Sequence, residues 1–174
     1  MKVSKLGALV GLSTALILGP VTAAQAQKPG FYLGAEVGVY NVDEGNVNEN
    51  DRVLKGYVGG QFTNWFAVEG SWTDFNRIDS GGDTFKADGA GLSAVFSLPM
   101  GSTSSLFVKA GQFWWDSDSV LGGTPGTSDG SDPFWGVGGK MGFSDHLALR
   151  LEVERYDVAD IDIYTLMGGL EYKF

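Results

Sequence analysis

The residues of this sequence that could carry chemistry are mostly charged. His146 is the single histidine and the chain has no cysteine, so a thiol nucleophile or a cysteine-based metal centre is excluded. The Asp-rich segments 43–51, 116–132 and 157–162 offer oxygen ligands for Ca²⁺ or Mg²⁺, but none has the EF-hand spacing. We therefore expect no catalytic residues, no metal site and no cofactor.

The more informative charges alternate with apolar residues. Arg150, Glu152 and Glu154 are each separated by one residue. The intervening and flanking positions are apolar: Leu147, Leu149, Leu151 and Val153. A period of two is the signature of a β-strand with two unlike faces, so these charges belong to one face of a strand.

The same rhythm recurs along the chain and predicts the elements that position these charges. Eight strands are expected, over 30–40, 52–62, 65–73, 85–98, 105–115, 134–143, 147–156 and 161–174. Short turns at 63–64, 99–104 and 144–146 alternate with polar connections at 41–51, 74–84, 116–133 and 157–160. Pro29, Pro99, Pro125 and Pro133 are placed at strand edges or in connections, since proline cannot donate to a β-ladder.

The first residues indicate export. Residues 1–26 combine Lys2 and Lys5 with an apolar run and a small-x-small site at 24–26, as in a cleaved secretory signal peptide. The predicted mature domain, 27–174, holds ten basic and 21 acidic residues, a net charge of −11. This balance argues against nucleic acid as a partner. After the signal peptide no run of 18 apolar residues occurs, so no membrane-spanning helix is predicted.

Eight such strands fit two kinds of barrel. A soluble lipocalin-type barrel would bury the apolar faces, whereas a membrane barrel would turn them toward lipid. Glycines share the charged face, where a narrow interior needs small residues beside long ones. Charges facing lipid would cost about 2–4 kcal/mol each near the midplane, and aromatic residues gather at the strand ends. We therefore predict an all-β, eight-stranded antiparallel transmembrane up-and-down β-barrel.

In such a barrel the charged faces form an interior network. Its predicted members are Glu36, Lys55, Glu69, Lys109, Lys140, Arg150, Glu152 and Glu171, with Glu154 as a ninth. Counted from the short turns, most of these residues fall at similar heights, so a single charged layer is expected. It would either fill the interior as a structural ion-pair network or act as a gate in a narrow water path.

Several stretches resemble a known family. The segments "VEGSW" (68–72), "VKAG" (108–111), "RLEVERYDV" (150–158) and "GGLEYKF" (168–174) are similar to those of the OmpA-like and OmpX-like small outer-membrane β-barrels. The resemblance covers the whole predicted mature chain. It implies a carboxy-terminal signal, read by the barrel-assembly machinery during insertion, at Gly169, Tyr172 and Phe174. It does not extend to the peptidoglycan-binding domain of OmpA.

The expected function is therefore an envelope structural and surface-interaction role in the outer membrane of a Gram-negative bacterium. Segments 41–51, 74–84 and 116–133 would serve as surface loops for a ligand, and lipid and lipopolysaccharide would surround the barrel. A small, low-conductance pore is the first alternative. A lipid A-modifying barrel enzyme is the second, although His146 would lie at the end opposite to the one such enzymes use.

Overall fold

The chain folds into eight strands and no helix over the residues described here. The computed structural model describes residues 29–42, 51–80, 83–121, 124–158 and 161–174. The strands are β1 (Gly30–Val42), β2 (Asp51–Gln61), β3 (Phe66–Ser80), β4 (Asp83–Met100), β5 (Ser104–Leu121), β6 (Thr124–Gly142), β7 (Leu147–Val158) and β8 (Ile161–Lys173). The predicted signal peptide, 1–26, and residues 43–50 of the predicted loop 41–51 lie outside the described residues.

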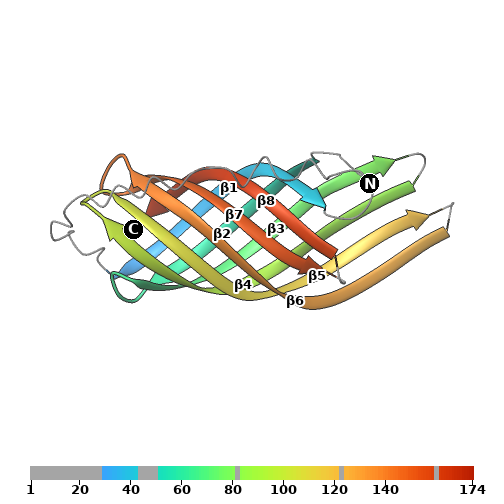
Figure 1. The fold of residues 1–174 in the computed structure, drawn as a ribbon, viewed down its shortest axis with the longest axis horizontal. Coiled ribbons are helices and arrows are strands. Elements are labelled where there is room, and N and C mark those ends of the chain that lie inside the picture. Colours follow the sequence, from blue (N-terminus) through green and yellow to red (C-terminus); the bar gives the residue numbers. More distant parts are fainter. Residues whose placement is uncertain (1–28, 43–50, 81–82, 122–123, 159–160) are drawn as a thin grey trace, which may run out of the picture.

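Each strand pairs with the next in antiparallel fashion, and β8 returns to pair with β1, so the sheet closes on itself (Figure 1). The closing ladder runs from Tyr32↔Lys173 to Val42↔Ile163. Closure satisfies the backbone hydrogen bonds without leaving an edge in the barrel wall. Among the described residues, no helix is long and apolar enough to span a membrane. The predicted eight-stranded up-and-down barrel is confirmed.

The two faces of each strand separate as the alternation predicts. Arg150 is 0% exposed inside the barrel, whereas its neighbour Leu151 is 54% exposed on the outer wall. On β5, Lys109 is buried while Val108 is half exposed. Polarity is thus inverted relative to a soluble barrel, with apolar side chains outside and ions inside.

The outer wall is an apolar band with marked boundaries. At the end with the short turns, Trp65, Phe143 and Phe174 are exposed. Toward the other end, Trp72 and Trp114 lie in one row across β3, β4 and β5, because both pair with Ala90. The next outward-facing row consists of four aspartates in direct cross-strand register: Asp74, Asp88, Asp116 and Asp129. Aromatic rings followed by carboxylates mark where an apolar membrane interior gives way to headgroups and water.

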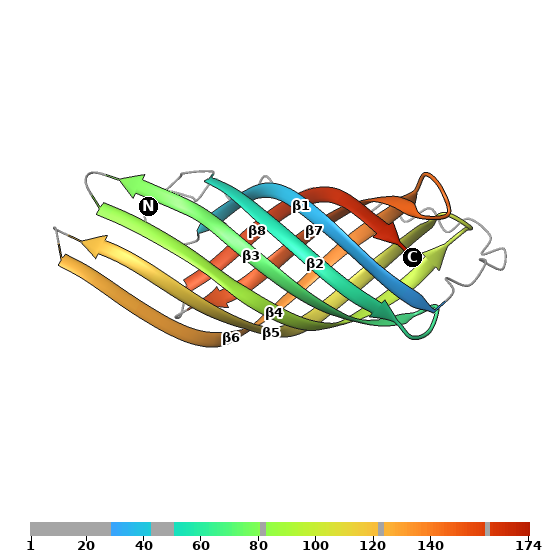
Figure 2. The ribbon, with the colours of Figure 1, turned by 180° about the vertical axis from the view of Figure 1, so that it is seen from behind.

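Two predicted loops are strands instead. Segments 74–84 and 116–133, expected to be polar loops, belong to β3–β4 and β5–β6 except at 81–82 and 122–123, which lie outside the described residues. These strands continue past the rim formed by β1, β2, β7 and β8 as a projecting sheet (Figures 1 and 2). Asp, Ser and Gly are typical of loops, but antiparallel pairing also accommodates them on solvent-exposed strands.

The proline placement agrees with the structure for Pro29, Pro99 and Pro125, which lie before a strand or one residue from a strand end, and is wrong for Pro133, which lies inside β6. Pro99, Pro125 and Pro133 lie within strands and are paired in register with Ser105, Val120 and Gln112. In each case no described residue pairs with the other side of the strand: β3–β4 pairing stops at Phe96, and β6–β7 pairing stops at Phe134. A missing N–H is tolerated where the strand is an edge.

The barrel interior is packed in three layers. An aromatic cluster near the short turns contains Tyr32, Tyr57, Ala67, Val95 and Phe107. A larger cluster toward the long hairpins contains Tyr40, Val53, Phe75, Ala87, Phe113, Trp115, Phe134, Tyr156, Ile163 and Met167. Along the strands, the buried charges lie largely between these two clusters. Close-packed side chains therefore enclose the charges, none of which is more than 7% exposed.

Candidate functional site

The interior charged layer is the candidate site because it gathers ionisable residues that a protein core ordinarily excludes. Seven strands contribute to it, all except β4, each through residues on its inward face. The structure places all eight predicted network residues there, together with Glu154, and none of the nine is more than 7% exposed. Because side chains alternate between the two faces of a strand, these residues all point into the interior. Closure of the sheet then brings them together.

Arg150 on β7 is the centre of the layer. Its Nη1 donates to Glu69 Oε2 at 2.7 Å and its Nη2 donates to Glu69 Oε1 at 3.1 Å, which forms a bidentate pair across the interior. The Nη2 and Nε atoms also donate to Glu152 Oε2, at 2.7 and 3.0 Å. The guanidinium carbon Cζ lies 4.3 Å from the Tyr57 ring centroid and 4.5 Å from that of Phe107. Bidentate pairing and ring stacking are specific to arginine, so lysine could not replace it.

Two lysines extend the layer toward the larger aromatic cluster. Lys55 Nζ donates to Glu152 and Glu154, at 2.6 Å in each case. Lys109 Nζ donates to Glu152 at 3.0 Å, approaches Glu69 at 3.5 Å and also pairs with Glu154. Each lysine therefore bridges two or more carboxylates from other strands. Such shared contacts tie strands that are distant in sequence to one another.

A third lysine completes the layer near the short turns. Lys140 Nζ donates to Glu171 Oε2 at 2.6 Å and lies 4.5 Å from the ring centroid of Tyr32. Arg150 Nη1 reaches the same oxygen of Glu171 at 3.4 Å. Lys140 is thus joined to the central guanidinium through one carboxylate, so the ion pairs form one connected network.

Sequence reasoning missed the tyrosines that complete this network. Tyr32 and Tyr57 donate their hydroxyl hydrogens to Glu69 and Glu171, at 3.2 and 3.3 Å. Tyr156 donates to Glu154 at 2.6 Å. The signal was available, because Tyr32 shares the parity of Glu36, Tyr57 that of Lys55 and Tyr156 that of Glu154. A search for charged residues alone does not find these hydrogen-bond donors, because tyrosine is uncharged.

The chemistry of this layer is electrostatic. Its carboxylates bind amine and guanidinium groups, and within the described residues no group of three or more His, Asp or Glu side chains is arranged to hold a metal ion. His146 lies in a turn on the outside, where its Nδ1 is 2.8 Å from the carbonyl oxygen of Lys173 and its ring stacks on Tyr172. The predicted His146 position at the short-turn end agrees with this placement.

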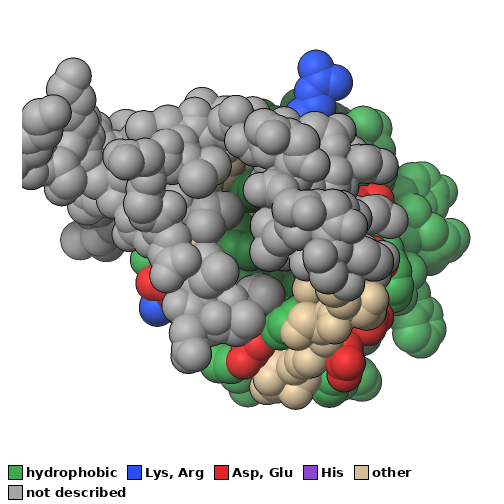
Figure 3. All heavy atoms as spheres, turned by 90° about the vertical axis from the view of Figure 1, so that its right-hand side faces the viewer, with side chains coloured by type: hydrophobic (Ala, Val, Ile, Leu, Met, Phe, Trp, Pro, Cys, Tyr) green, Lys and Arg blue, Asp and Glu red, His purple; other side chains and the backbone are tan. Residues whose placement is uncertain are grey.

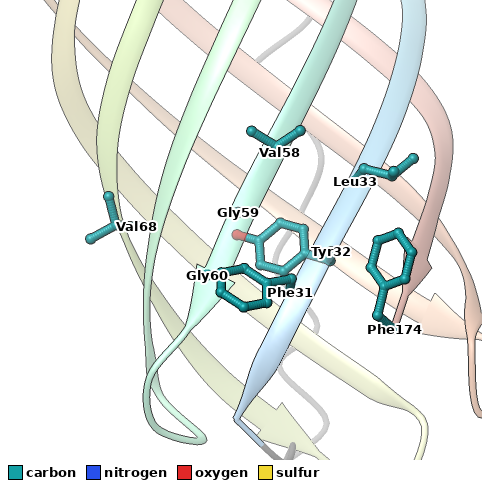
Figure 4. Close-up of a pocket in the computed structure, with 8 residues that line it drawn as sticks. All are labelled: Phe31, Tyr32, Leu33, Val58, Gly59, Gly60, Val68 and Phe174. Atoms are coloured by element: carbon teal, nitrogen blue, oxygen red, sulfur yellow. The ribbon is translucent and has the colours of Figure 1, made fainter.

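The residues of the predicted assembly signal lie where the barrel closes. Phe174 donates its backbone N–H to the carbonyl of Phe31 at 3.0 Å, and both rings lie on the outer wall (Figure 4). Tyr172 packs edge to face against Phe174, with ring centroids 5.3 Å apart. Gly169 faces inward, and a Cβ there would approach the Cα and Cγ atoms of Glu36 to 2.7 Å. Recognition of these residues by an assembly machinery stays a prediction.

The wall beside this closure also needs a glycine. Tyr32 turns inward while Phe31 and Leu33 face outward, and the ring of Tyr32 lies against Gly59 on β2 (Figure 4). A side chain at Gly59 would collide with this ring. The glycines on the charged face therefore make room for the aromatic and charged side chains that fill the interior, as the sequence predicts.

Comparison with known proteins places this geometry in a family. The family model described as the outer membrane protein beta-barrel domain matches residues 11–174. No curated protein matches the chain at a significant level.

Solved structures share the fold at low sequence identity. Neisserial surface protein A is 16% identical, with a TM-score of 0.72 over 83% of this chain and 97% of that one. The amino-terminal barrel of Pseudomonas aeruginosa OprF is 12% identical, with a TM-score of 0.67 over 84% and 100%. The Yersinia pestis attachment invasion locus protein Ail is 18% identical, with a TM-score of 0.60 over 84% and 97%. Ail has also been solved with the heparin analogue sucrose octasulfate.

Proposed function

The chain belongs to the outer membrane protein β-barrel domain family and lies in the outer membrane of a Gram-negative bacterium, and we propose that it is a non-enzymatic envelope protein that binds partners at the cell surface. The observation that carries this proposal is the projecting sheet. In this family short turns face the periplasm and long connections face outward, so the sheet extends from the cell.

Among the residues that the structure describes, the projecting sheet has two edges without a pairing partner. Pairing of β2 with β3 stops at Phe75, although β3 continues to Ser80. Pairing of β6 with β7 stops at Phe134, which leaves residues 124–133 of β6 paired only with β5. Ten residues correspond to about 33 Å of strand. Free strand edges are templates for another extended chain, so they favour recognition through backbone hydrogen bonds.

The charge of this sheet favours a basic partner. Its outward face carries the aligned aspartates Asp116 and Asp129, continued by Asp88 and Asp74 on β4 and β3. Acidic side chains (red) are visible at this end of the molecule (Figure 3). A polysulfated ligand such as the one bound to Ail would meet like charge here. We therefore infer a cationic, extended polypeptide as the partner class, with lipopolysaccharide meeting the same face through cations.

This role predicts that a shortened sheet loses binding. Replacing residues 118–127 by Asn-Gly joins the register partners Ser117 and Ser128 through a two-residue hairpin turn. Purified protein in neutral nanodiscs should bind an alternating Lys-Val peptide, measured by calorimetry, with an affinity that falls as salt rises. The shortened variant should lose most of this binding. Equal binding by both proteins, or preference for heparin, would refute the proposed surface.

The packed interior favours a closed barrel over the pore alternative. Rings from both aromatic clusters and the ion network fill the lumen along its length. An eight-stranded barrel has an interior just wide enough for its own side chains. We expect no steady ionic current from purified protein in planar bilayers. A stable ohmic current that increases with each insertion would favour the pore instead.

A further inference from the structure

The buried charges of the barrel are unequal in number. Side chains that are at most 7% exposed include four cations: Lys55, Lys109, Lys140 and Arg150. They include five carboxylates: Glu36, Glu69, Glu152, Glu154 and Glu171. If every group were ionised, the layer would carry one excess negative charge inside a low-dielectric wall, where an uncompensated charge is costly.

Glu36 is the carboxylate that no buried cation reaches with a hydrogen bond. The other four each accept a hydrogen bond of 2.7 Å or less from a buried cation. Glu36 is 1% exposed, and neither of its oxygens has a hydrogen-bond partner in the described part of the chain. The Arg150 Nε atom lies 3.6 Å from Glu36 Oε1 and donates its hydrogen to Glu152 instead. The excess negative charge of a fully ionised layer would therefore lie on Glu36.

Neighbouring groups cannot turn to Glu36 without abandoning better contacts. Lys55, its register partner on β2, is held 2.6 Å from both Glu152 and Glu154. On β7, Arg150 forms ion pairs with Glu69 and Glu152. Lys140 forms an ion pair with Glu171 on β8. The β8 residue opposite Glu36 is Gly169, which supplies space and no donor side chain.

What does face Glu36 is another carboxyl group. Arg150 Nε lies 3.6 Å from Glu36 Oε1 and 3.0 Å from Glu152 Oε2, so the two carboxyl groups face the same guanidinium nitrogen. Two carboxylates cannot hydrogen-bond, since both only accept, but a carboxylic acid donates to a carboxylate through one shared proton. A single proton would satisfy Glu36 and also bring the layer to four positive and four negative charges.

We propose that Glu36 is a proton-binding site: its carboxyl group is protonated in the folded barrel and donates a hydrogen bond to Glu152. The proton is a structural ligand of the ion network, taken up when the barrel closes and sealed from water by the aromatic clusters. In the unfolded chain Glu36 is a solvated carboxylate at neutral pH.

This arrangement sets the sign of the pH dependence. The folded barrel holds a proton that the unfolded chain lacks, so the linkage slope is negative and stability falls as the pH rises. Relative to a variant without this proton, the folding equilibrium constant of the wild type should fall about tenfold per pH unit while the folded barrel holds the proton and the unfolded chain does not, and this slope should end once Glu36 ionises in the folded barrel. Glu36→Gln is that variant, because its amide donates the same hydrogen bond at every pH.

The test compares Glu36→Gln with Glu154→Gln in lipid vesicles, by urea unfolding between neutral and alkaline pH. Glu36→Gln should match or exceed the wild type at neutral pH and lack its alkaline decline. Glu154→Gln removes a paired charge and should lower the equilibrium constant at least about a hundredfold. Equal losses in the two variants at neutral pH, or parallel pH profiles for Glu36→Gln and wild type, would overturn the proposal.

Infrared spectroscopy keeps the proposal falsifiable if a variant fails to insert. The wild-type barrel at neutral pH should show the carbonyl stretch of a protonated carboxylic acid, shifted by deuterium exchange and lost at alkaline pH. A spectrum without this band would mean that all five glutamates are ionised, and would exclude the proton as the ligand of Glu36.

Discussion

Arg150→Met should lower the free energy of unfolding of the barrel by about 3–5 kcal/mol, a large share of the 5–15 kcal/mol typical of folded proteins. The guanidinium is wholly buried and contacts Glu69, Glu152 and Glu171. Methionine fills similar volume but leaves these carboxylates facing one another without their central cation. The lower free energy of unfolding comes from buried carboxylates that have lost their cation, and not from a cavity.

The matched control lies on the same strand. Arg155 forms an ion pair with Asp162 at 2.6 Å, but both side chains are about one-third exposed. Because water screens this pair, Arg155→Met should lower the free energy of unfolding far less than Arg150→Met does. Urea unfolding in lipid vesicles, followed by tryptophan fluorescence, measures both variants. Comparable losses at the two positions would mean that the interior network contributes no more than a surface ion pair.

Leu151→Arg should destabilise the inserted barrel by about 2–4 kcal/mol. Leu151 is 54% exposed next to Arg150 on β7 and lies midway along the outer wall. A charge at this height faces hydrocarbon, where no counter-ion or water compensates it. The same residue type is therefore required at position 150 and excluded at position 151.

Met100→Arg provides the control for depth. Met100 is also exposed, at 48%, but ends β4 beside a short turn. Near the interface an arginine costs only about 0–1 kcal/mol. The difference between Leu151→Arg and Met100→Arg should vanish in a soluble barrel. If both variants unfold at the wild-type urea concentration in vesicles, the outer wall does not face lipid.

The number of strands and the face of each residue were predictable from the sequence. Alternation assigned Arg150 inward and Leu151 outward, and the structure agrees. Strand ends were not predictable in the same way, because Asp116, Pro125 and Pro133 are typical of loops. They lie in strands because β5 and β6 pair along their whole length, a long-range contact that overrides local propensity.

The membership of the charged layer was predictable, whereas its pairings were not. Arg150 and Glu69 are 81 residues apart and meet across the interior. Which side chains meet depends on the stagger of eight ladders around the barrel, and no local pattern encodes that stagger. The isolation of Glu36 follows from these pairings, so it emerged only in three dimensions.

The claim that the barrel has an apolar outer wall and a polar interior is tested most directly on β3. Neutral residues of this strand point both inward and outward. The chain has no cysteine, so single-cysteine variants report one position each. Thr73 is 0% exposed and Ala67 is 1% exposed inside, whereas Trp72 is 53% exposed and Val68 also faces outward. A thiol reagent dissolved in the bilayer should modify Val68→Cys and Trp72→Cys and spare Ala67→Cys and Thr73→Cys. The opposite pattern, or equal labelling of all four, would contradict an apolar wall facing lipid and an enclosed polar interior.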